Sequence, residues 1–506
     1  MTLPGWLDPL PGAAEQRAAD RWAIEELGIP GLELMERAGA GLAEAVAARA
    51  PTGRVVVVAG TGNNGGDGLV AARLLRGLGR EVDVLALGDP AGWRGDAAAN
   101  LERLPGEPPD RFEAAALDGA AAVVDAMLGT GFSGAPREPV AGAIAAVNAA
   151  GEAGVAVVAC DVPSGVDAST GEAAGAAVAA DATVTFAAAK PGLWIAPGKR
   201  LAGALTVVDI GIPRGAPGEA AIGLITPRVL DLVPRRGADS TKFTAGSVLV
   251  CGGSTGLSGA PALAALAAAR AGAGYVTAAV PASLDQILST RLLEVMTLPL
   301  AEREGGLSTE ALGALLARDG REDALVLGPG LGRSGPAAEL ARAAAARSAL
   351  PLVLDADGLN AHAGRLADLA ARDAPTILTP HGGELARLLG CDGDEVLAHR
   401  LALAREAAAA ARAVLVLKGD DTLVAHPDGR VAVSPGGAPA LATAGTGDVL
   451  SGTVAALLAK RMEPWAAACA AVLAHVRAGR LAAAETGSEG VLASDVAARL
   501  PAALAR

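Results

Sequence analysis

Two glycine-rich turns constrain the fold of this chain more than any other feature. The segment GTGNNGGDG, from Gly60 to Gly68, directly follows the apolar run Val55 to Ala59, and a second segment, AGTGDVLSG, spans Ala444 to Gly452. A glycine turn between a parallel strand and a helix presents free backbone N–H groups and the positive end of the helix, which together hold a phosphate without cationic side chains. We therefore expect two α/β centres on one chain, each acting on a phosphorylated small molecule.

Length and composition support an α/β architecture with more than one domain. The chain has 506 residues, which exceeds the size of one ordinary hydrophobic core. Hydrophobic residues make up 51% but aromatic residues only 2%, so Ala, Val and Leu dominate the apolar residues. Such residues suit parallel sheets covered by helices with small side chains.

Strand-like and helix-like segments alternate twice along the chain, as in doubly wound α/β folds. Helices are expected at 16–27 and 31–48, the turns at 211–221 and 234–246 mark a boundary near 215–240, and helices dominate from Gly447 onward. The expected strands before the boundary are 54–59, 81–87, 121–127, 155–160, 182–187 and 204–210, and those after it are 247–251, 274–280, 323–327, 350–354, 376–379 and 413–417.

Charge and hydropathy exclude several classes of protein. A net charge of −13 argues against a general nucleic-acid or anionic-membrane surface, because both require clustered Lys or Arg. The segment from Phe243 to Ala269 has no charged residue, but its glycines and Pro261 are inconsistent with a membrane-spanning helix. The four cysteines are far apart and form no CxxC pair. They predict reduced core residues and a cytoplasmic location.

The first glycine turn is followed by two further loops that end predicted strands. DAMLGTGFSGAP begins at Asp125 and CDVPSGVD at Cys160. An isolated aspartate at a strand end commonly caps a helix, but three loops at one sheet edge indicate a ligand crevice. Oxygen atoms of Asn64, Asp125 and Ser164 would suit a hard cation, which leaves Asp161 as an acid or base.

These motifs resemble the NAD(P)H-hydrate epimerase domain. The resemblance rests on LMERAGAGLAEA, GTGNNGGDGLVAARLL, DAMLGTG, CDVPSGVD and TFAAAKPG in this order, within residues 1–215. The family interconverts the R and S forms of nicotinamide dinucleotides hydrated at C6, NADHX and NADPHX. Thr61 stands where asparagine is more usual, although the following Asn-Asn-Gly-Gly-Asp is intact.

The resemblance implies roles for individual residues of this first domain. It implies K⁺ at Asn64, Asp125 and Ser164, and Asp161 as the catalytic residue against the hydrated ring. The implied dinucleotide contacts are Asn63, Asn64, Gly65, Gly66, Asp67, Gly129, Thr130, Gly131, Phe132, Ser133, Gly134 and Ala135.

The second glycine turn indicates phosphoryl transfer. Gly445 and Gly447 would open a helix that cradles a phosphoryl group, and Asp448 in its first turn can accept a proton from a hydroxyl. Lys418 in VLVLKGDDT and His381 in LTPHGGEL both follow strand-like runs, where ligand contact competes with a solvated or structural role. Lys242 also precedes a strand and turn.

The second half resembles the ADP-dependent NAD(P)H-hydrate dehydratase domain, which is ribokinase-like. The motifs KFTAGSVLVCGGSTGLSGAP, LGPGLGR, DADGLN, TPHGGE, LKGDDT and AGTGDVLSG carry the resemblance over residues 222–506. It implies that ADP phosphorylates the hydroxyl of the S hydrate and that Asp448 is the base. The implied hydrate contacts are Ala260, Gly330, His381 and Asp448, and the implied nucleotide contacts are Lys418, Gly419, Asp420, Asp421, Thr422 and Gly447.

Some alternatives remain open at this level. A small-alcohol kinase fused to a non-catalytic ligand-binding or scaffold domain fits the second turn taken alone. Mg²⁺ is expected with ADP, but the sequence contains no recognisable set of residues that would bind it. The sequence does not choose between NADHX and NADPHX, or between ADP and ATP. Ala-rich helices favour a homo-oligomer.

Overall fold

The computed structural model describes residues 2–213, 215–216 and 218–505, and these form two compact units. One unit holds Pro9–Ile222, and the other holds Gly223–Arg506 together with Pro4–Asp8. The sequence placed the first domain at 1–215 and the second at 222–506. The structure therefore adds a short segment near the start of the chain to the second unit.

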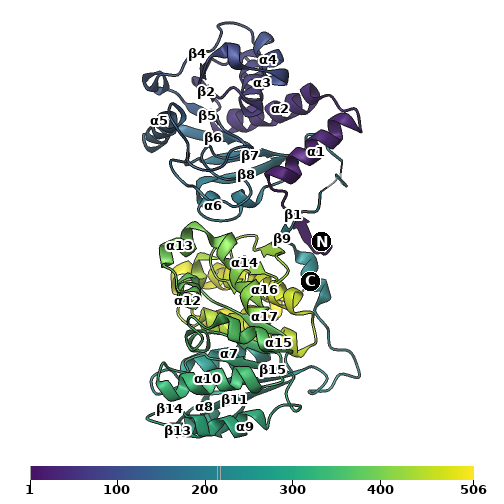
Figure 1. The fold of residues 1–506 in the computed structure, drawn as a ribbon, viewed down its shortest axis with the longest axis vertical. Coiled ribbons are helices and arrows are strands. Elements are labelled where there is room, and N and C mark those ends of the chain that lie inside the picture. Colours follow the sequence, from purple (N-terminus) through teal and green to yellow (C-terminus); the bar gives the residue numbers. More distant parts are fainter. Residues whose placement is uncertain (1, 214, 217, 506) are drawn as a thin grey trace. The chain divides into compact units, whose positions relative to one another are not determined.

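The first unit is a seven-stranded parallel sheet with helices on both faces (Figure 1). Its strand order β4-β3-β2-β5-β6-β7-β8 reverses direction between β2 and β5, which is where ligands bind in doubly wound sheets. The strands are β2 Val55–Ala59, β3 Val82–Ala86, β4 Asp110–Arg111, β5 Ala122–Ala126, β6 Ala156–Cys160, β7 Ala182–Phe186 and β8 Ala204–Val208. The helices are α1 Ala13–Glu25, α2 Gly31–Arg49, α3 Asn63–Gly77, α4 Gly95–Glu102, α5 Val140–Glu152 and α6 Gly198–Leu201.

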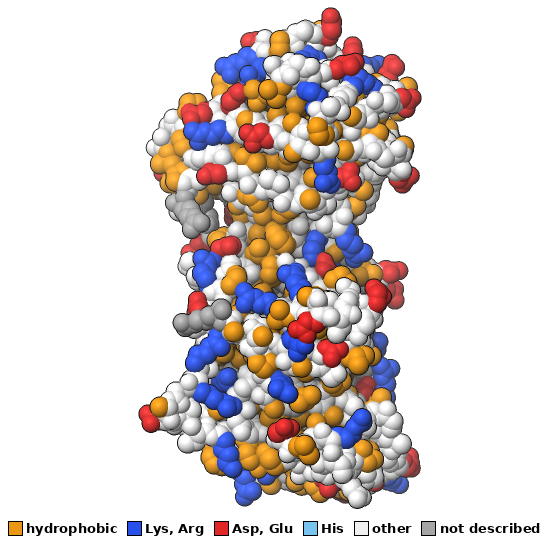
Figure 2. All heavy atoms as spheres, turned by 180° about the vertical axis from the view of Figure 1, so that it is seen from behind, with side chains coloured by type: hydrophobic (Ala, Val, Ile, Leu, Met, Phe, Trp, Pro, Cys, Tyr) orange, Lys and Arg blue, Asp and Glu red, His pale blue; other side chains and the backbone are white. Residues whose placement is uncertain are grey.

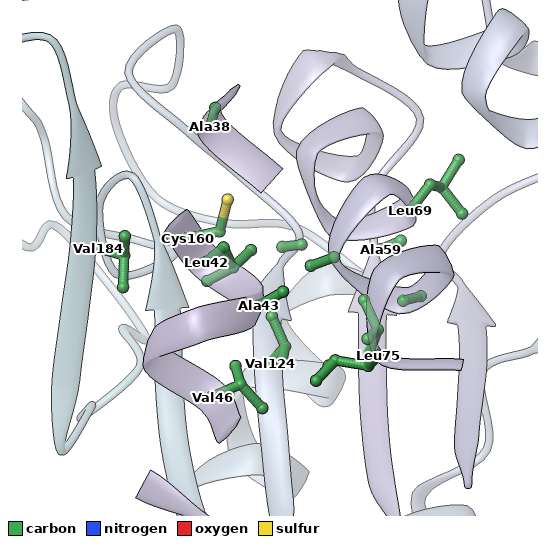
Figure 3. Packing of buried hydrophobic residues seen from close by; sticks show 14 of the residues in the cluster. Ala38, Leu42, Ala43, Val46, Ala59, Leu69, Leu75, Val124, Cys160 and Val184 are labelled. Atoms are coloured by element: carbon green, nitrogen blue, oxygen red, sulfur yellow. The ribbon is translucent and has the colours of Figure 1, made fainter. Parts of the chain in front are cut away.

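Alternate side chains of the central strands fill two cores, one on each face of this sheet. Helix α2 buries Leu34, Ala38, Leu42 and Val46, which are spaced four residues apart and form one apolar stripe. Figure 3 shows Leu42, Val46 and Leu75 from α2 and α3 gathered around Val124 on β5. On the other face, α5 packs against Val56, Val58, Val123 and Val157. Burial on both faces explains the unbroken valine run of β2.

The second unit contains an eleven-stranded sheet in the order β1-β9-β20-β19-β18-β17-β16-β15-β10-β11-β12. From β18 to β12 neighbouring strands are parallel, whereas β18, β19 and β20 form an antiparallel meander. The strands are β1 Leu7–Pro9, β9 Ile222–Ile225, β10 Ser247–Cys251, β11 Tyr275–Pro281, β12 Met296–Leu300, β15 Ala324–Leu327, β16 Leu352–Leu354, β17 Thr376–Leu378, β18 Val414–Leu417, β19 Leu423–Ala425 and β20 Val431–Val433; β13 Glu302–Arg303 and β14 Gly306–Leu307 form a separate pair.

Helices cover both faces of the second sheet (Figure 1). They are α7 Gly259–Arg270, α8 Ala282–Arg291, α9 Leu312–Leu316, α10 Gly335–Arg347, α11 Asp357–Asn360, α12 Gly382–Leu389, α13 Gly393–Ala398, α14 Arg400–Ala411, α15 Thr446–Ala459, α16 Pro464–Thr486 and α17 Ala493–Ala503. The α/β prediction is confirmed for both units, and each predicted strand is present to within one or two residues at either end. Strands β1, β4, β9, β12, β13, β14, β19 and β20 were not predicted.

Strand β1 belongs to the second unit although it is separated from β9 by the whole first unit. The carbonyl of Trp6 accepts hydrogen bonds from the backbone N–H (3.2 Å) and the hydroxyl (2.8 Å) of Thr226. The ring of Trp6 meets that of Trp465 on α16 edge to face, with 5.3 Å between centroids. These contacts fix the edge of the second sheet.

The segment Phe243 to Ala269 forms β10, a turn and the start of α7, so the prediction that it does not span a membrane is confirmed. Among the described residues, only α16 is long and apolar enough to cross a membrane, and 78% of its apolar window is buried. A helix buried in a protein core can be equally long and apolar.

On the face drawn in Figure 2, Lys and Arg side chains alternate with Asp and Glu, and no long basic stripe crosses the coloured part. The expected absence of nucleic-acid and membrane partners stays a prediction.

Candidate active sites

The first candidate site is a cavity of about 640 Å³ at the carboxyl edge of the first sheet. The turn Gly60–Gly62 leaves β2 and enters α3, whose first residue is Asn63. A Cβ on Gly65 would lie 1.8 Å from the carbonyl oxygen of Gly60, so only glycine allows this close approach. The turn, the loop from Met127 to Phe132 and Asp161 all line the cavity. The three predicted loops therefore converge as expected.

Asn64, Asp125 and Ser164 form a connected group of oxygen ligands beside this cavity. Asp125 is fully buried and accepts hydrogen bonds from the Ser164 hydroxyl (2.5 Å) and backbone N–H (2.8 Å). Burial raises the pKa of Asp125 to about 6, although the Ser164 hydrogen bonds lower it. The Asn64 amide donates to the Leu128 carbonyl at 2.9 Å, while its buried Oδ1 has no hydrogen-bond partner among the described residues. A buried carboxyl group beside an unpaired amide oxygen fits a hard cation.

Asp161 is held in place by a buried lysine. Its φ is +64°, in the left-handed region that aspartate adopts more readily than most residues other than glycine. The Lys190 ammonium, with a side chain only 1% exposed, donates to Asp161 at 2.6 Å, to the Thr185 hydroxyl at 2.7 Å and to the Phe186 carbonyl at 2.9 Å. Thr185 also donates to Asp161 at 3.0 Å. The carboxylate therefore faces the cavity in one fixed orientation.

A second carboxyl group, Asp67, lines the cavity from α3. Burial, followed by the charges of Asp161 and Asp20, raises the pKa of Asp67 well above its usual range, although Lys190 lowers it. The cavity therefore holds a carboxyl group paired with a lysine and a second carboxyl group whose pKa is raised.

The second candidate site lies at the start of α15. Gly445, with φ +90°, precedes the helix, and Asp448 sits half-buried in its first turn. Burial and the negative charge of Asp355 raise the pKa of Asp448 to about 7, although Lys418 lowers it. A carboxyl group with such a pKa is poised to accept a proton near neutral pH.

A chain of polar contacts surrounds Asp448. The Lys418 ammonium lies 3.1 Å from Asp355 and 3.7 Å from Glu384, and the other oxygen of Asp355 accepts from the Ser451 hydroxyl on α15. Burial lowers the pKa of Lys418, but Asp355 and Glu384 raise it, and the net shift is upward. Lys418 therefore stays charged, next to the exposed N–H groups that begin α15.

Lys418 also borders a cavity of about 450 Å³ whose far wall is apolar. Gly419, Asp420 and Thr422 lie on the polar side, and Thr446 and Gly447 belong to the N-terminus of α15. The apolar wall is formed by Leu441, Leu450, Val472 and Val476. A phosphate group would fit the polar end and an aromatic base the apolar end.

His381 and Gly330 lie on loops of the second unit, and Ala260 lies in the first turn of α7. A Cβ on Gly330 would stand 3.1 Å from the Cβ of Ala260, so these two residues are direct neighbours. His381 caps α12 by accepting from the N–H of Gly383, its Nε2 lies 3.5 Å from Glu384, and its side chain is 55% exposed. Glu384 thus connects His381 to Lys418.

The chain matches two protein-family models and curated relatives along almost its whole length. Residues 31–192 match the family described as YjeF-related protein N-terminus, and residues 248–502 match NAD(P)H-hydrate dehydratase. A bifunctional NAD(P)H-hydrate repair enzyme of Moorella thermoacetica is 42% identical over 97% of this chain and 95% of its own length. That of Pyrobaculum aerophilum is 42% identical over 97% of both chains.

The chain belongs to the family of bifunctional NAD(P)H-hydrate repair enzymes.

A solved structure resembles the second unit of this family member. It is an ADP/ATP-dependent NAD(P)H-hydrate dehydratase from Bacillus subtilis, crystallised with ATP and Mg²⁺, with 31% identity, a TM-score of 0.47 and coverage of 54% of this chain and 94% of its own. The two family models and the full-length relatives confirm the resemblance to the repair family that the motifs indicated.

The structure brings part of the expected residues of this repair enzyme together at the two cavities. Gly129 to Phe132 line the first cavity, but Ser133, Gly134 and Ala135 are exposed and outside its lining. Gly65 and Gly66 are also outside that lining, and the lining of the second cavity does not include Ala260, Gly330, His381 or Asp448. Asp421 forms a buried ion pair with Arg400 at 2.9 Å and does not line the second cavity. Lys242 is exposed over the rings of Phe243 and Tyr275 and lines neither cavity.

Several residues of the repair enzyme's sites were missed by the sequence analysis. Lys190, Asp355 and Glu384 lie inside quoted motifs, yet their pairing depends on partners 29, 96 and 34 residues away, namely Asp161, Ser451 and Lys418. Gln16 and Asp20 line the first cavity from α1, and no motif pointed to them. Three cysteines are buried as expected, whereas Cys391 is partly exposed.

Proposed function

We propose that the first unit interconverts the R and S forms of hydrated NAD(P)H and that the second unit dehydrates the S form with ADP. The observation that carries this proposal is that one chain of the repair family retains both centres, with Asp161 fixed at the first and Asp448 poised at the second. A small-alcohol kinase with a non-catalytic first domain would not require the paired Asp161 and Lys190.

In the first unit, Asn63 to Asp67 and Gly129 to Ala135 would contact the dinucleotide, with its phosphates at the N-terminus of α3. Asp161 would exchange a proton with the hydroxyl on C6. Asn64, Asp125 and Ser164 would hold K⁺, which supplies the positive charge that the buried carboxylate lacks. The unpaired Oδ1 of Asn64 supports this assignment.

In the second unit, Asp448 would remove the proton from the C6 hydroxyl as that oxygen attacks the β-phosphorus of ADP. AMP leaves, the phosphate ester then loses phosphate from C6 and a proton from C5, and NAD(P)H is restored. The N–H groups of α15, together with Gly447, would hold the phosphoryl group, and Lys418 would neutralise charge on the nucleotide. Gly419 to Thr422 would hold the rest of the nucleotide, and Ala260, Gly330 and His381 the hydrate.

Mg²⁺ is expected with ADP. The described residues contain no group of three His, Cys, Asp or Glu side chains that could hold a metal ion, so the nucleotide phosphates would supply most of its ligands. The four free cysteines fit the predicted cytoplasmic location. A homo-oligomer remains our prediction.

The decisive experiment mixes the purified protein with a characterised mixture of R and S NADHX and Mg²⁺, with or without ADP, in K⁺ or Na⁺. The absorbance of NADH reports repair. We expect complete ADP-dependent recovery of both epimers in K⁺, and a slower second phase, for the R form, in Na⁺. Recovery of only the S form in K⁺ would refute the epimerase assignment, and no recovery with ADP or ATP would favour the small-alcohol kinase.

A further inference from the structure

Helix α1 forms a wall of the first cavity that lies ahead of the segment matched by the family model, which starts at residue 31. Its first N–H, that of Ala13, donates to the Ser169 hydroxyl at 3.0 Å. Ser169 belongs to the same loop as Asp161. Near the other end of α1, Ala23 is fully buried in the core. The helix is therefore fixed at both ends, and its orientation relative to Asp161 is fixed with it.

Asp20 is the carboxyl group that α1 presents to this cavity. The buried amide of Gln16, one turn earlier, donates to Asp20 Oδ1 at 2.9 Å, which orients the side chain. Burial raises the pKa of Asp20; the Gln16 hydrogen bond and Lys190 lower it, Asp161 raises it, and the net shift is upward. Asp20 thus lines the cavity from α1, whereas Asp161 and Lys190 line it from the loops after β6 and β7.

The charges in the cavity cannot all be compensated. Asp20, Asp67 and Asp161 share one lysine, Lys190, whose ammonium already contacts Asp161. The other charged side chains lining the cavity are Arg17 and Asp96. Carboxyl groups in such a cluster do not all ionise together, so protonated and ionised carboxyl groups coexist. Sites of this kind provide an acid and a base at the same pH.

Exchange of R and S at C6 requires an acid and a base on opposite faces of the ring. The hydroxyl must leave from one face and water must add to the other, and in the reverse direction the two roles swap. A single carboxylate fixed on one wall, such as Asp161, serves one face only. This requirement rests on the proposed epimerase function.

We propose that Asp20 is the second acid–base residue of the epimerisation. In one direction, the Asp20 carboxyl group gives its proton to the C6 hydroxyl, the C–O bond breaks, and the nitrogen lone pair forms an iminium as water departs. Water then adds to C6 from the opposite face and transfers a proton to the Asp161 carboxylate. In the reverse direction, Asp161 donates and Asp20 accepts, which restores both groups.

The test measures epimer exchange by chromatography in the absence of ADP, so that the second unit does not dehydrate the S form. We expect Asp20→Asn to lower kcat about 100-fold or more with KM within a factor of about three, because general acid–base groups contribute factors of this size. Asp20→Glu should recover part of the loss. Glu25→Gln, which changes an exposed carboxylate on the same helix outside the cavity, should leave the rate unchanged. Circular dichroism and the urea unfolding transition of the first unit report folding of each variant.

Three results would overturn the proposal. These are an unchanged kcat in Asp20→Asn, a loss that appears only in KM, or a loss of kcat confined to a parallel Asp67→Asn variant. Failure of the unmodified protein to exchange the epimers would instead refute the epimerase assignment itself, so the two failures are distinguishable.

Discussion

Asp161 and Asp448 are the candidate acid–base residues of the two units, and their electrostatic surroundings differ. Asp161 follows a central parallel strand and is held by a buried ammonium at 2.6 Å. Asp448 begins a helix, lies near Asp355 and Glu384, and has a pKa raised to about 7, while its nearest cation, Lys418, is bound to those two neighbours. A carboxyl group at such a site can therefore be paired with a lysine, or can have a pKa near 7 when the nearby lysine contacts other carboxyl groups.

The strongest test of this comparison exchanges each carboxylate for its amide. Asp448→Asn should reduce dehydration of the S form roughly a thousandfold and leave epimer exchange intact, because it removes a proton acceptor from one unit only. Asp161→Asn should do the reverse. Separate assays with R and S NADHX measure both activities. If either change abolished both activities in a folded protein, the assignment of one reaction to each unit would be wrong.

The next largest effect is expected from Lys190→Met. This change leaves Asp161 buried without its cation and should lower the free energy of unfolding of the first unit by about 3–5 kcal/mol. Denaturation by urea, followed by circular dichroism, measures it in active and inactive variants alike. The double variant Lys190→Met and Asp161→Asn should regain most of the stability, because the uncompensated charge is gone. Equal loss in the single and double variants would contradict the pairing.

A smaller effect is expected on the pH dependence of dehydration. Asp448 must be ionised to act as a base, so kcat/KM should fall about tenfold per unit as the pH drops below about 7. Asp355→Asn should move this limb to lower pH, because it removes the largest of the nearby negative charges that raise the pKa of Asp448. Asp357→Asn should move it less. A limb near pH 4 in the unmodified protein would exclude Asp448 as the base.

The sequence was sufficient to predict both sheets and the loops that carry the sites. Glycine turns after apolar runs locate strand ends, and parallel strands bring those ends to one edge. Ser164 donates to Asp125, and both Asn64 and Ser164 contact Leu128, as expected for residues at one edge, while their role at a cation stays a prediction. Such local patterns are common to α/β folds with parallel sheets.

The partners of these residues could not be predicted in the same way. Lys190 contacts Asp161 because the loop after β7 meets the loop after β6. Asp20 lines the cavity only because α1 packs beside it. Asp355 and Ser451 are 96 residues apart. Strands β19 and β20 follow β18 as an antiparallel meander without intervening helices, so the alternation of strand and helix did not indicate them.

The place of β1 in the second sheet bears on how the protein is made. Translation produces Trp6 first, yet its partner Thr226 follows 220 residues later, and Trp465 later still. The ribosome therefore completes the first unit before the strand with which β1 pairs has been made, and β1 stays unpaired until then. A second unit expressed alone from residue 222 would lack this strand and expose β9 as a free edge, which favours pairing with other chains. An affinity tag fused ahead of Pro4 would likewise be felt first by the dehydratase unit, although it precedes the epimerase unit in the gene.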